Sequence, residues 1–433
     1  MSRIYDYIVR ALFVILPFHV LLSVFLEYKI GIPGAGLYKE VGLIALAGLL
    51  GYSYITKRIE IKFDRIDVLC AIYVAWLVLV TVLNQLHFSN FFYGGRYDFE
   101  FLVAFFLARK GFPLLEKPIS YYMRLFLISA SAALVLGILV RFVFGETILL
   151  HFGFSANLSN WMFGGSIPIY HGIDGANVRR FQGIFDGPNP AAFFILVYLG
   201  VLIHFFRENK KYHYLLSLWV IVLLMVIFYT YSRSAIIGLF VGVFAFIALS
   251  IRVIIKKYSK QLLIALPLLF LFLGLFALKF ESTIERIILR EDSTKGHFDR
   301  AIIGLERAKD KPLGSGLATS GPGYRYVIHP ETDESLFEGD NKKLEDYYIP
   351  ESWYIQQMVE GGVIGFAVFI AIIGLILMQL AVANSFVFAS LVSVSVMNLF
   401  LHSYESTYIS LLFFMIIGLI LAAHDARKNR LAR

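Results

Sequence analysis

Long hydrophobic runs separated by short polar connections dominate this chain. About 20 consecutive apolar residues are enough to cross the roughly 30 Å hydrocarbon core of a bilayer, and on this measure the pattern predicts about twelve transmembrane helices. The fourth run is short and opens with Asp98 and Glu100, yet the direction of every later span depends on it. The predicted spans lie near residues 8–28, 38–56, 67–86, 98–108, 119–144, 190–206, 213–231, 234–251, 261–279, 352–379, 384–402 and 406–423. The fold class is therefore an all-α polytopic integral membrane protein with one membrane domain, residues 1–433.

Two long polar segments interrupt the hydrophobic pattern, at residues 145–188 and 280–350. The second contains the stretch "DRAIIGLERAKDK", in which Ile302, Ile303 and Leu305 follow a helical spacing that stops at Pro312. An apolar stripe on a charged helix predicts an amphipathic helix lying over the membrane surface.

Lysine and arginine residues alternate from one connection to the next. Cytoplasmic connections of membrane proteins are enriched in these residues, so the alternation places both termini in the cytoplasm and both long polar segments outside. The basic connections contain Lys57, Arg58, Lys62 and Arg65; Arg109, Lys110 and Lys117; Arg207, Lys210 and Lys211; Arg252, Lys256, Lys257 and Lys260; and Arg427, Lys428, Arg430 and Arg433.

Composition excludes several other classes of protein. The 433 residues are 58% hydrophobic and 16% charged, which is unlike a soluble domain. The net charge of +8 is scattered over short connections rather than gathered on one basic face, which argues against a nucleic-acid partner. The single cysteine, Cys70, excludes an internal disulfide, and the acidic stretch "ETDES" at 331–335 has the character of a solvated loop, so we predict neither a metal site nor a cofactor. The first run has no small-residue cleavage site after it, so we expect a retained helix.

Several arginines fall on the predicted outward face, where the charge rule disfavours them. Arg233 is the most unusual because almost no polar connection separates the two apolar runs around it. Snorkelling toward water explains any one such residue, whereas convergence of several on one face favours anion binding. A guanidinium group donates two parallel hydrogen bonds to phosphate, so a lipid diphosphate is the expected anion. The outward arginines are Arg96, Arg141, Arg179, Arg180, Arg233, Arg286, Arg290 and Arg300.

A second candidate site lies in "PESWYIQQMVEGGVIGF", where Glu351 precedes a predicted span. An acidic residue at a helix start often only caps the helix. The functional alternative makes Glu351 a general base that takes a proton from an acceptor hydroxyl, with His297 and His329 as rivals for that role. Trp353 and Tyr354 suit either the membrane interface or stacking on a sugar.

Four motifs resemble the bacterial superfamily of O-antigen polymerases (Wzy type) and O-antigen ligases. "RFQGIFDGPNPAA" resembles the family's Arg-x-x-Gly and Pro-Asn segment, and "YSRSAIIGL" its Ser-Arg segment. "DSTKGHFDRAIIGLERAKDKPLGSGLATSG" resembles the outer-loop arginine followed by Pro-Leu-Gly-x-Gly, and "ESWYIQQMVEGGVIGF" the closing helix with Glu and paired glycines. The resemblance covers roughly residues 180–365 and implies a GT-C-like glycosyltransferase architecture.

The resemblance also implies roles for individual residues. Arg180, Arg233 and Arg300 become the main diphosphate-binding arginines, and Arg233 and Arg300 join Glu351 as catalytic candidates. Glu351 stands where ligases carry a histidine followed by asparagine, and the Glu-Ser pair here favours a polymerase. The secondary diphosphate candidates are Arg290 and Arg179, and the glycan candidates are Trp353, Tyr354, Asn189 and His297.

The implied activity is polymerisation of polyprenyl-diphosphate-linked oligosaccharide repeat units, without a metal, at the outer face of the bacterial cytoplasmic (inner) membrane. The expected partners are that glycan, the lipid bilayer, a chain-length regulator and a flippase. Two alternatives stay open: a ligase that transfers the glycan to lipid A core or another acceptor, and a transporter of an anionic or lipid-linked solute. Arginines grouped around one outward cavity favour transfer, whereas a central aqueous path favours transport.

Overall fold

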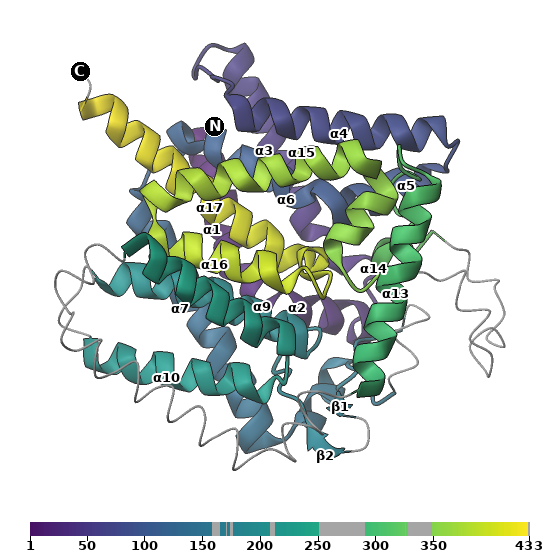
Figure 1. Ribbon diagram of the computed structural model, residues 1–433. Helices are drawn as coiled ribbons and strands as arrows, with labels where there is room; N and C mark the ends of the chain where they lie inside the picture. The colour runs from purple at the N-terminus through teal and green to yellow at the C-terminus, as the bar shows by residue number, and fades with distance from the viewer. Residues whose placement is uncertain are drawn as a thin grey trace.

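The structure is a computed structural model that describes residues 1–157, 165–169, 171–173, 176–207, 213–250, 291–324, 326–327 and 349–431. Helices dominate the described part of the chain (Figure 1). The labelled α-helices are α1 (Ser2–Ile15), α2 (His19–Val24), α3 (Tyr38–Ile55), α4 (Arg65–Leu83), α5 (Phe88–Gly94), α6 (Glu100–Lys110), α7 (Ile119–Leu139), α9 (Pro188–Arg207), α10 (His213–Tyr229), α13 (Glu291–Asp310), α14 (Gly321–Tyr324), α15 (Trp353–Ala383), α16 (Ser385–Met397) and α17 (Thr407–Leu431). A further helix, Arg233–Ser250, follows α10.

Within the described residues, seven helices are long and apolar enough to cross a membrane. They coincide with the predicted spans 8–28, 67–86, 119–144, 190–206, 234–251, 352–379 and 406–423. Four more predictions fall on helices that are shorter or more polar, namely α3, α6, α10 and α16, while 261–279 lies outside the described residues. The prediction of an all-α membrane protein is confirmed, whereas the number of spans stays a prediction.

The uncertain fourth span is longer than its hydrophobic run. A π-helical segment, η4 (Gly95–Phe99), joins α5 to α6, so the chain is helical from Phe88 to Lys110. At about 1.5 Å per residue a helix of this length is long enough to cross the roughly 30 Å hydrocarbon core. The hydropathy pattern underestimated the length of this helix, because Asp98 and Glu100 are polar residues that are buried inside the protein.

Helix α17 forms the centre of the bundle and packs most extensively on α6. Its residues from Tyr408 to Ala422 are almost all buried. A side chain at Gly418 would lie 2.6 Å from the carbonyl oxygen of Phe105 and 3.2 Å from Ala108, so the small residue allows close backbone approach. Close packing of this kind is what holds helices together where lipid removes the hydrophobic drive.

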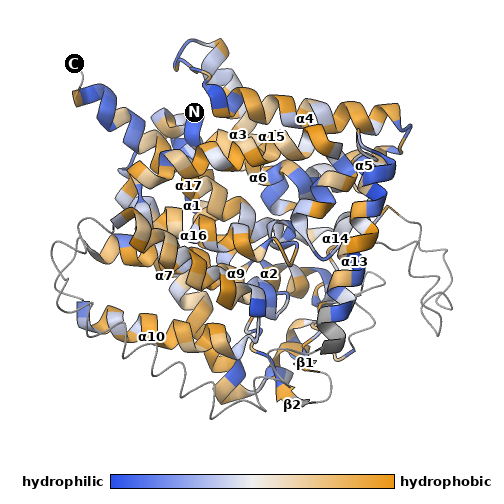
Figure 2. Ribbon diagram, viewed as in Figure 1, coloured by the Kyte–Doolittle hydropathy of each residue, from blue (hydrophilic) through white to orange (hydrophobic). Residues whose placement is uncertain are grey.

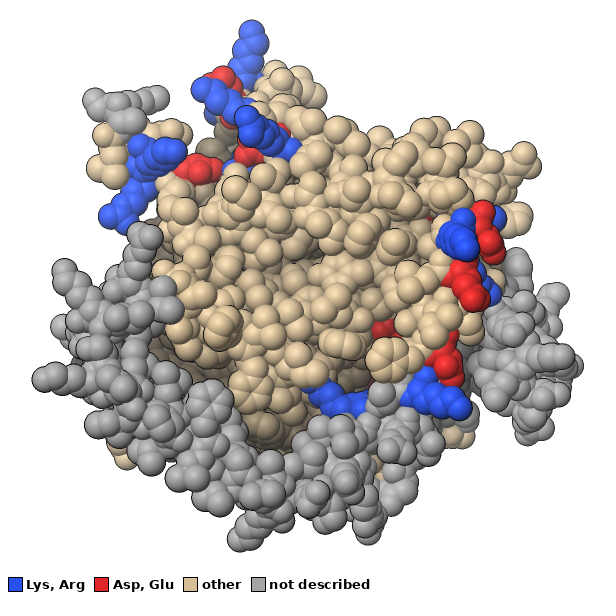
Figure 3. Space-filling view, in the orientation of Figure 1, with Lys and Arg blue, Asp and Glu red and all other residues tan. Residues whose placement is uncertain are grey.

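Charged side chains gather at two ends of the molecule. Figure 3 shows Lys, Arg, Asp and Glu around the C-terminal end of α17 and the α3–α4 connection on one side, and along α13 on the other, with an uncharged band between them. The helices that span this band are mostly apolar in Figure 2. We call the two sides the C-terminal end and the α13 end of the bundle.

The predicted amphipathic helix is present as α13, and Figure 1 shows it crossing the ends of α15 and its neighbours rather than running beside them. Gly304 and Ala308 face the protein, whereas Phe298, Ile302 and Leu305 are exposed. The polar segment 145–188 contains a structure that the hydrophobic pattern did not predict, an antiparallel pair of short strands, β1 (Gly172–Ile173) and β2 (Ala176–Arg179).

Candidate active site beneath helix α13

A cavity of about 680 Å³ lies at the α13 end of the bundle. The segments before α9 and before α15 and the α16–α17 connection line it, together with residues of α2, α5 and η4. Three predicted residues line this cavity: Arg180, Asn189 and Glu351. Its charged or titratable lining residues are His19, Glu27, Arg96, His171, Arg180, Asp186, Glu351, His402 and Glu405.

Glu351 meets two side chains of α13. The guanidinium group of Arg300 donates a hydrogen bond to Oε1 of Glu351, and Nδ1 of His297 lies 3.5 Å from Oε2. His297 and Arg300 are three residues apart and therefore share one face of the helix. Glu351 itself has φ +51, in the left-handed region that side chains other than glycine adopt rarely. It is not a capping residue, because Ser352 holds the N-cap position of α15.

A kink in α15 explains how α13 reaches Glu351. Gly362 has φ 63 and ψ −167, which interrupts the helix and leaves the carbonyl groups of Val359 and Glu360 without their helical partners. Backbone N–H groups of Ser315 and Gly316 donate to these two carbonyls at 2.8 and 2.9 Å. The conformation of Gly362 is essentially restricted to glycine.

The Pro-Leu-Gly-x-Gly motif, Pro312–Gly316, is the segment that docks on this kink. The N–H of Val363 returns a hydrogen bond to the carbonyl of Pro312 at 3.0 Å. A Cβ at Gly314 would lie 2.4 Å from the carbonyl oxygen of Glu360, and one at Gly362 would lie 2.4 Å from that of Pro312, so both glycines are needed for contact. Because α13 ends at Asp310, the docked motif anchors the helix that carries His297 and Arg300.

The first motif also contacts the residues directly before the second. The N–H of Phe181 donates to the carbonyl of Tyr229 at 2.7 Å, and Nε of Arg180 donates to the carbonyl of Thr230 at 2.8 Å. Arg180 also donates from Nη2 to Oδ1 of Asn189 at 2.8 Å. These contacts join the "RFQG" and "GPNP" segments to the end of α10, a few residues before Arg233.

The charged residues of the second, third and fourth motifs all act on the imidazole of His297. Burial lowers the pKa of His297, and the nearby guanidinium groups of Arg233 and Arg300 lower it further, while the Glu351 carboxylate opposes this shift. The imidazole is therefore neutral at neutral pH. Arg233, half-buried at the start of its helix, thus acts on the same group as Arg300 and Glu351. The four motifs quoted from the sequence converge on one region.

Three histidines that were not predicted for the site line the cavity, namely His19, His171 and His402. His402 lies in the connection between α16 and α17. His171 accepts the N–H of Arg180 on its carbonyl and places Nδ1 3.0 Å from Oε1 of Gln182. His402 sits inside a predicted span and His171 outside any motif, so only their position in the fold brings them to the site.

A group of buried acids lies behind Glu405. The carboxyl groups of Asp98 and Glu360 are hydrogen-bonded to each other, and a hydrogen bond between two carboxyl groups requires one proton. The amide nitrogen of Gln356 donates to both Asp98 and Glu405, and the N–H of Ser320 donates to Glu360 at 3.1 Å. This network gives its side of the cavity an acidic character.

Not every predicted residue joins the site. Trp353 is fully buried against Phe101, Phe369 and Tyr404, so the prediction that it stacks on a sugar is wrong for this conformation because no face of the indole is accessible. Tyr354 packs on Phe366 and Phe369 and donates its hydroxyl to the carbonyl of Ser395 at 2.9 Å, away from the lining residues. Both residues fix the start of α15, where Glu351 stands.

The remaining candidates have other positions. Arg179, at the end of β2, is exposed and accepts a hydrogen bond from Arg141 on its carbonyl. Arg290, together with Arg286 and His329, lies outside the described residues. The described residues contain no group of three His, Cys, Asp or Glu side chains arranged to hold a metal ion.

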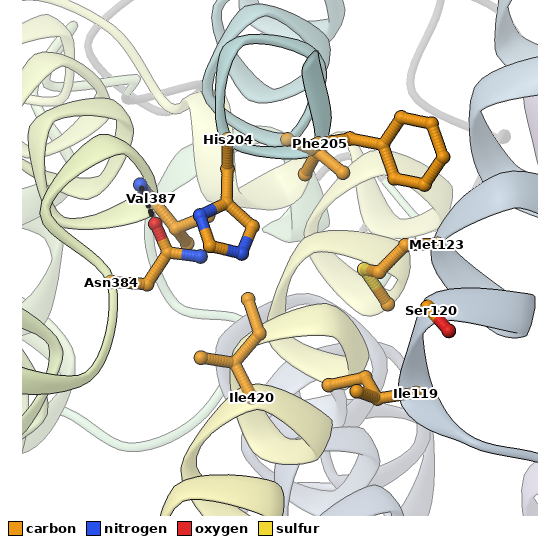
Figure 4. Close-up of a pocket in the computed structure, with 9 residues that line it drawn as sticks. Ile119, Ser120, Met123, His204, Phe205, Asn384, Val387 and Ile420 are labelled. Atoms are coloured by element: carbon orange, nitrogen blue, oxygen red, sulfur yellow. Dashed lines mark hydrogen bonds between the residues drawn. The ribbon is translucent and has the colours of Figure 1, made fainter. Parts of the chain in front are cut away.

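A second, smaller pocket of about 140 Å³ lies near the C-terminal end of the bundle. Figure 4 shows His204 and Phe205 of α9 pointing into it, with Asn384, which caps α16, opposite His204. Ile119, Met123, Val387 and Ile420 make the rest of the lining largely apolar. None of the residues predicted for the site lines this pocket.

Comparison with protein families identifies the segment that carries most of this geometry. Residues 216–370 match the family model described as O-antigen ligase. The resemblance to the O-antigen ligase and polymerase superfamily is confirmed. The matched segment begins in α10 and ends in α15, so it contains Arg233, α13, the docked Pro312–Gly316 segment and Glu351. A comparison with curated proteins gave no match.

Proposed function

We propose that the chain is a glycosyltransferase that polymerises polyprenyl-diphosphate-linked oligosaccharide repeat units. The observation that carries this proposal is the convergence of Arg300, His297 and Glu351 beside a cavity that Arg180 also lines, within a chain of this superfamily. The cavity lies at the α13 end of the bundle. We assign that end to the outer face of the bacterial inner membrane and both termini to the cytoplasm, in keeping with the alternating basic connections.

In the proposed reaction, the hydroxyl oxygen of an acceptor sugar attacks the anomeric carbon of the donor glycan. The bond between that carbon and the diphosphate oxygen breaks, and its electron pair stays on the departing phosphate. Arg180, Arg233 and Arg300 stabilise the negative charge that grows there, which fixed cations do effectively where water is excluded. Diphosphate leaves readily without protonation, so these residues suffice without a metal.

The acceptor proton goes to Glu351. In the unliganded chain this carboxylate is paired with Arg300. A bound diphosphate competes for the same guanidinium group, which releases Glu351 to accept the proton with neutral His297 beside it. The base and the diphosphate site are thus coupled through one arginine.

The test is a measurement of product length. The purified chain in lipid nanodiscs receives lipid-linked repeat units extracted from the source cells as the only glycan, beside Arg233→Ala and Glu351→Gln variants. A ladder of multiples that both substitutions abolish supports a polymerase with these roles. Transfer only after addition of a lipid A core acceptor identifies a ligase, and inactivity with both substrates refutes glycosyl transfer and favours a transporter.

A further inference from the structure

The cavity is several times larger than a diphosphate group requires. Its 680 Å³ falls within the roughly 300–1,000 Å³ of pockets that enclose whole organic ligands. The predicted diphosphate residue Arg180 lines the cavity, and so do residues of α2, α5 and η4, which no motif of the family resemblance includes. These elements offer lining residues for another part of the substrate.

Three tyrosines that line the cavity form a stacked wall. Tyr326 stacks on Tyr93 and Tyr97 with ring centroids 5.0 and 5.9 Å apart and an angle of 12° between planes in both pairs. Tyr93 and Tyr97 are one helical turn apart, and Tyr97 is almost fully buried, so they hold the third ring in place. Tyr326 is 38% exposed and lines the cavity.

Packing of the segment before Tyr326 fixes the position of this wall. The amide nitrogen of Asn90 donates to the carbonyl of Leu317 at 3.0 Å. A Cβ at Gly94 would lie 2.5 Å from Cβ of Leu317, and one at Gly323 would lie 3.3 Å from the ring of Tyr97. The wall is therefore preformed rather than assembled around a ligand.

The charges beside the wall balance each other. Nε of Arg96 lies 2.7 Å from Oε1 of Glu40, and the fully buried Lys39 contacts both Glu40 and Glu100, at 2.6 and 3.0 Å. These two cations and two carboxylates carry no net formal charge. Since Glu27 and Glu405 also line the cavity, this side repels an anion but offers donors and acceptors to hydroxyl groups.

We propose that Tyr326, supported by Tyr93 and Tyr97, forms with Arg96 a subsite for an uncharged pyranose of the lipid-linked glycan. The apolar C–H face of the sugar lies on the exposed tyrosine ring, and Arg96 with its carboxylate partner binds sugar hydroxyls. An aromatic ring offers a large rigid apolar face at little entropic cost. This subsite rests on the proposed function, because it extends the same cavity away from the diphosphate.

Binding of the glycan without its lipid diphosphate tests the subsite separately from catalysis. The probe is the glycan released from the lipid-linked pool of the source cells, labelled at its reducing end and titrated against the full chain in nanodiscs. We expect Tyr326→Phe to bind as the wild type does and Tyr326→Ala to weaken binding about tenfold, equivalent to about 1.4 kcal/mol. Tyr214→Ala is the control, since Tyr214 is 84% exposed at the start of α10, far from the cavity lining.

The Arg96→Gln variant tests the chemical class of the sugar. Because Gln keeps hydrogen-bonding groups and removes only the charge, we expect a loss of less than about threefold and little dependence on salt. A large loss of affinity in Arg96→Gln, together with a similar loss when salt is added to the wild type, would mean that Arg96 binds an anionic sugar. That result would overturn the assignment. Unchanged binding by Tyr326→Ala, or no binding by the wild type, would overturn the subsite itself.

The product-length assay separates these failures from failure of the proposed function. If the wild type polymerises but binds no free glycan, the subsite is wrong and the transferase is right. If it binds the glycan through Tyr326 but transfers nothing, the subsite stands and the proposed reaction is wrong.

Discussion

Substitution of Gly362 by alanine should undock α13 from the active site. Gly362 adopts a conformation that costs a residue with a side chain about 1–3 kcal/mol. The added Cβ would lie 2.4 Å from both the carbonyl carbon of Leu313 and the carbonyl oxygen of Pro312, so the docked segment must move. That movement breaks the hydrogen bonds from Ser315 and Gly316, each worth about 1 kcal/mol.

The expected loss is therefore about 3–5 kcal/mol for the docked region, with activity falling at least about 100-fold because Arg300 leaves the proposed diphosphate site. Unfolding of the purified chain in mixed detergent and SDS micelles gives the stability, and initial transfer rates give the activity. Gly374→Ala is the matched control, because Gly374 lies in the same helix and a Cβ there meets no atom within 4 Å. The reasoning is refuted if the Gly362 variant is as stable and as active as the Gly374 variant.

Three further predictions concern single side chains. Arg300→Ala should lower turnover about 100- to 1,000-fold, since it removes a donor to the departing phosphate. The free energy of unfolding should change by less than about 1 kcal/mol, since the Arg300 side chain is 51% exposed. A purely structural role would change the free energy of unfolding instead of turnover. Activity should persist as the pH falls through the usual histidine range, because the lowered pKa of His297 keeps its imidazole neutral beside Glu351, and a wild-type rate that falls within that range, but not in His297→Gln, would contradict this. Glu360→Gln should fold normally, because Gln replaces a carboxyl that shares a proton with Asp98. Glu360→Ala should lower the free energy of unfolding by about 1–3 kcal/mol, because it leaves the Ser320 N–H without an acceptor. Equal unfolding curves for the two variants would argue against the shared proton.

Hydrophobic periodicity predicted the helices well because it measures the property that membrane insertion selects. It failed where a polar side chain is buried inside the protein, as at Asp98. The short strands β1 and β2 were not predicted, since a pair of this length has almost no alternating pattern to detect.

The arginines and Glu351 could be chosen from sequence because a charge beside an apolar run is costly and therefore conspicuous. Their contacts could not be predicted. The pairing of Arg300 with Glu351 depends on the Gly362 kink, and the presence of His402 in the cavity depends on the path of the α16–α17 connection. The prediction that Trp353 stacks on a sugar failed for a different reason. An aromatic residue at the start of a helix is equally suited to an interface and to a packed core.

The central claim is that Arg180 and Arg300 serve one diphosphate site. Equilibrium binding of polyprenyl diphosphate and of polyprenyl monophosphate to the chain in nanodiscs tests it most directly, with Arg180→Ala, Arg300→Ala and the exposed control Arg179→Ala. The account predicts that the wild type prefers the diphosphate by at least about tenfold and that either of the first two substitutions abolishes this preference, while the third does not. Equal affinity for the two lipids, or a preference that survives both substitutions, would contradict it.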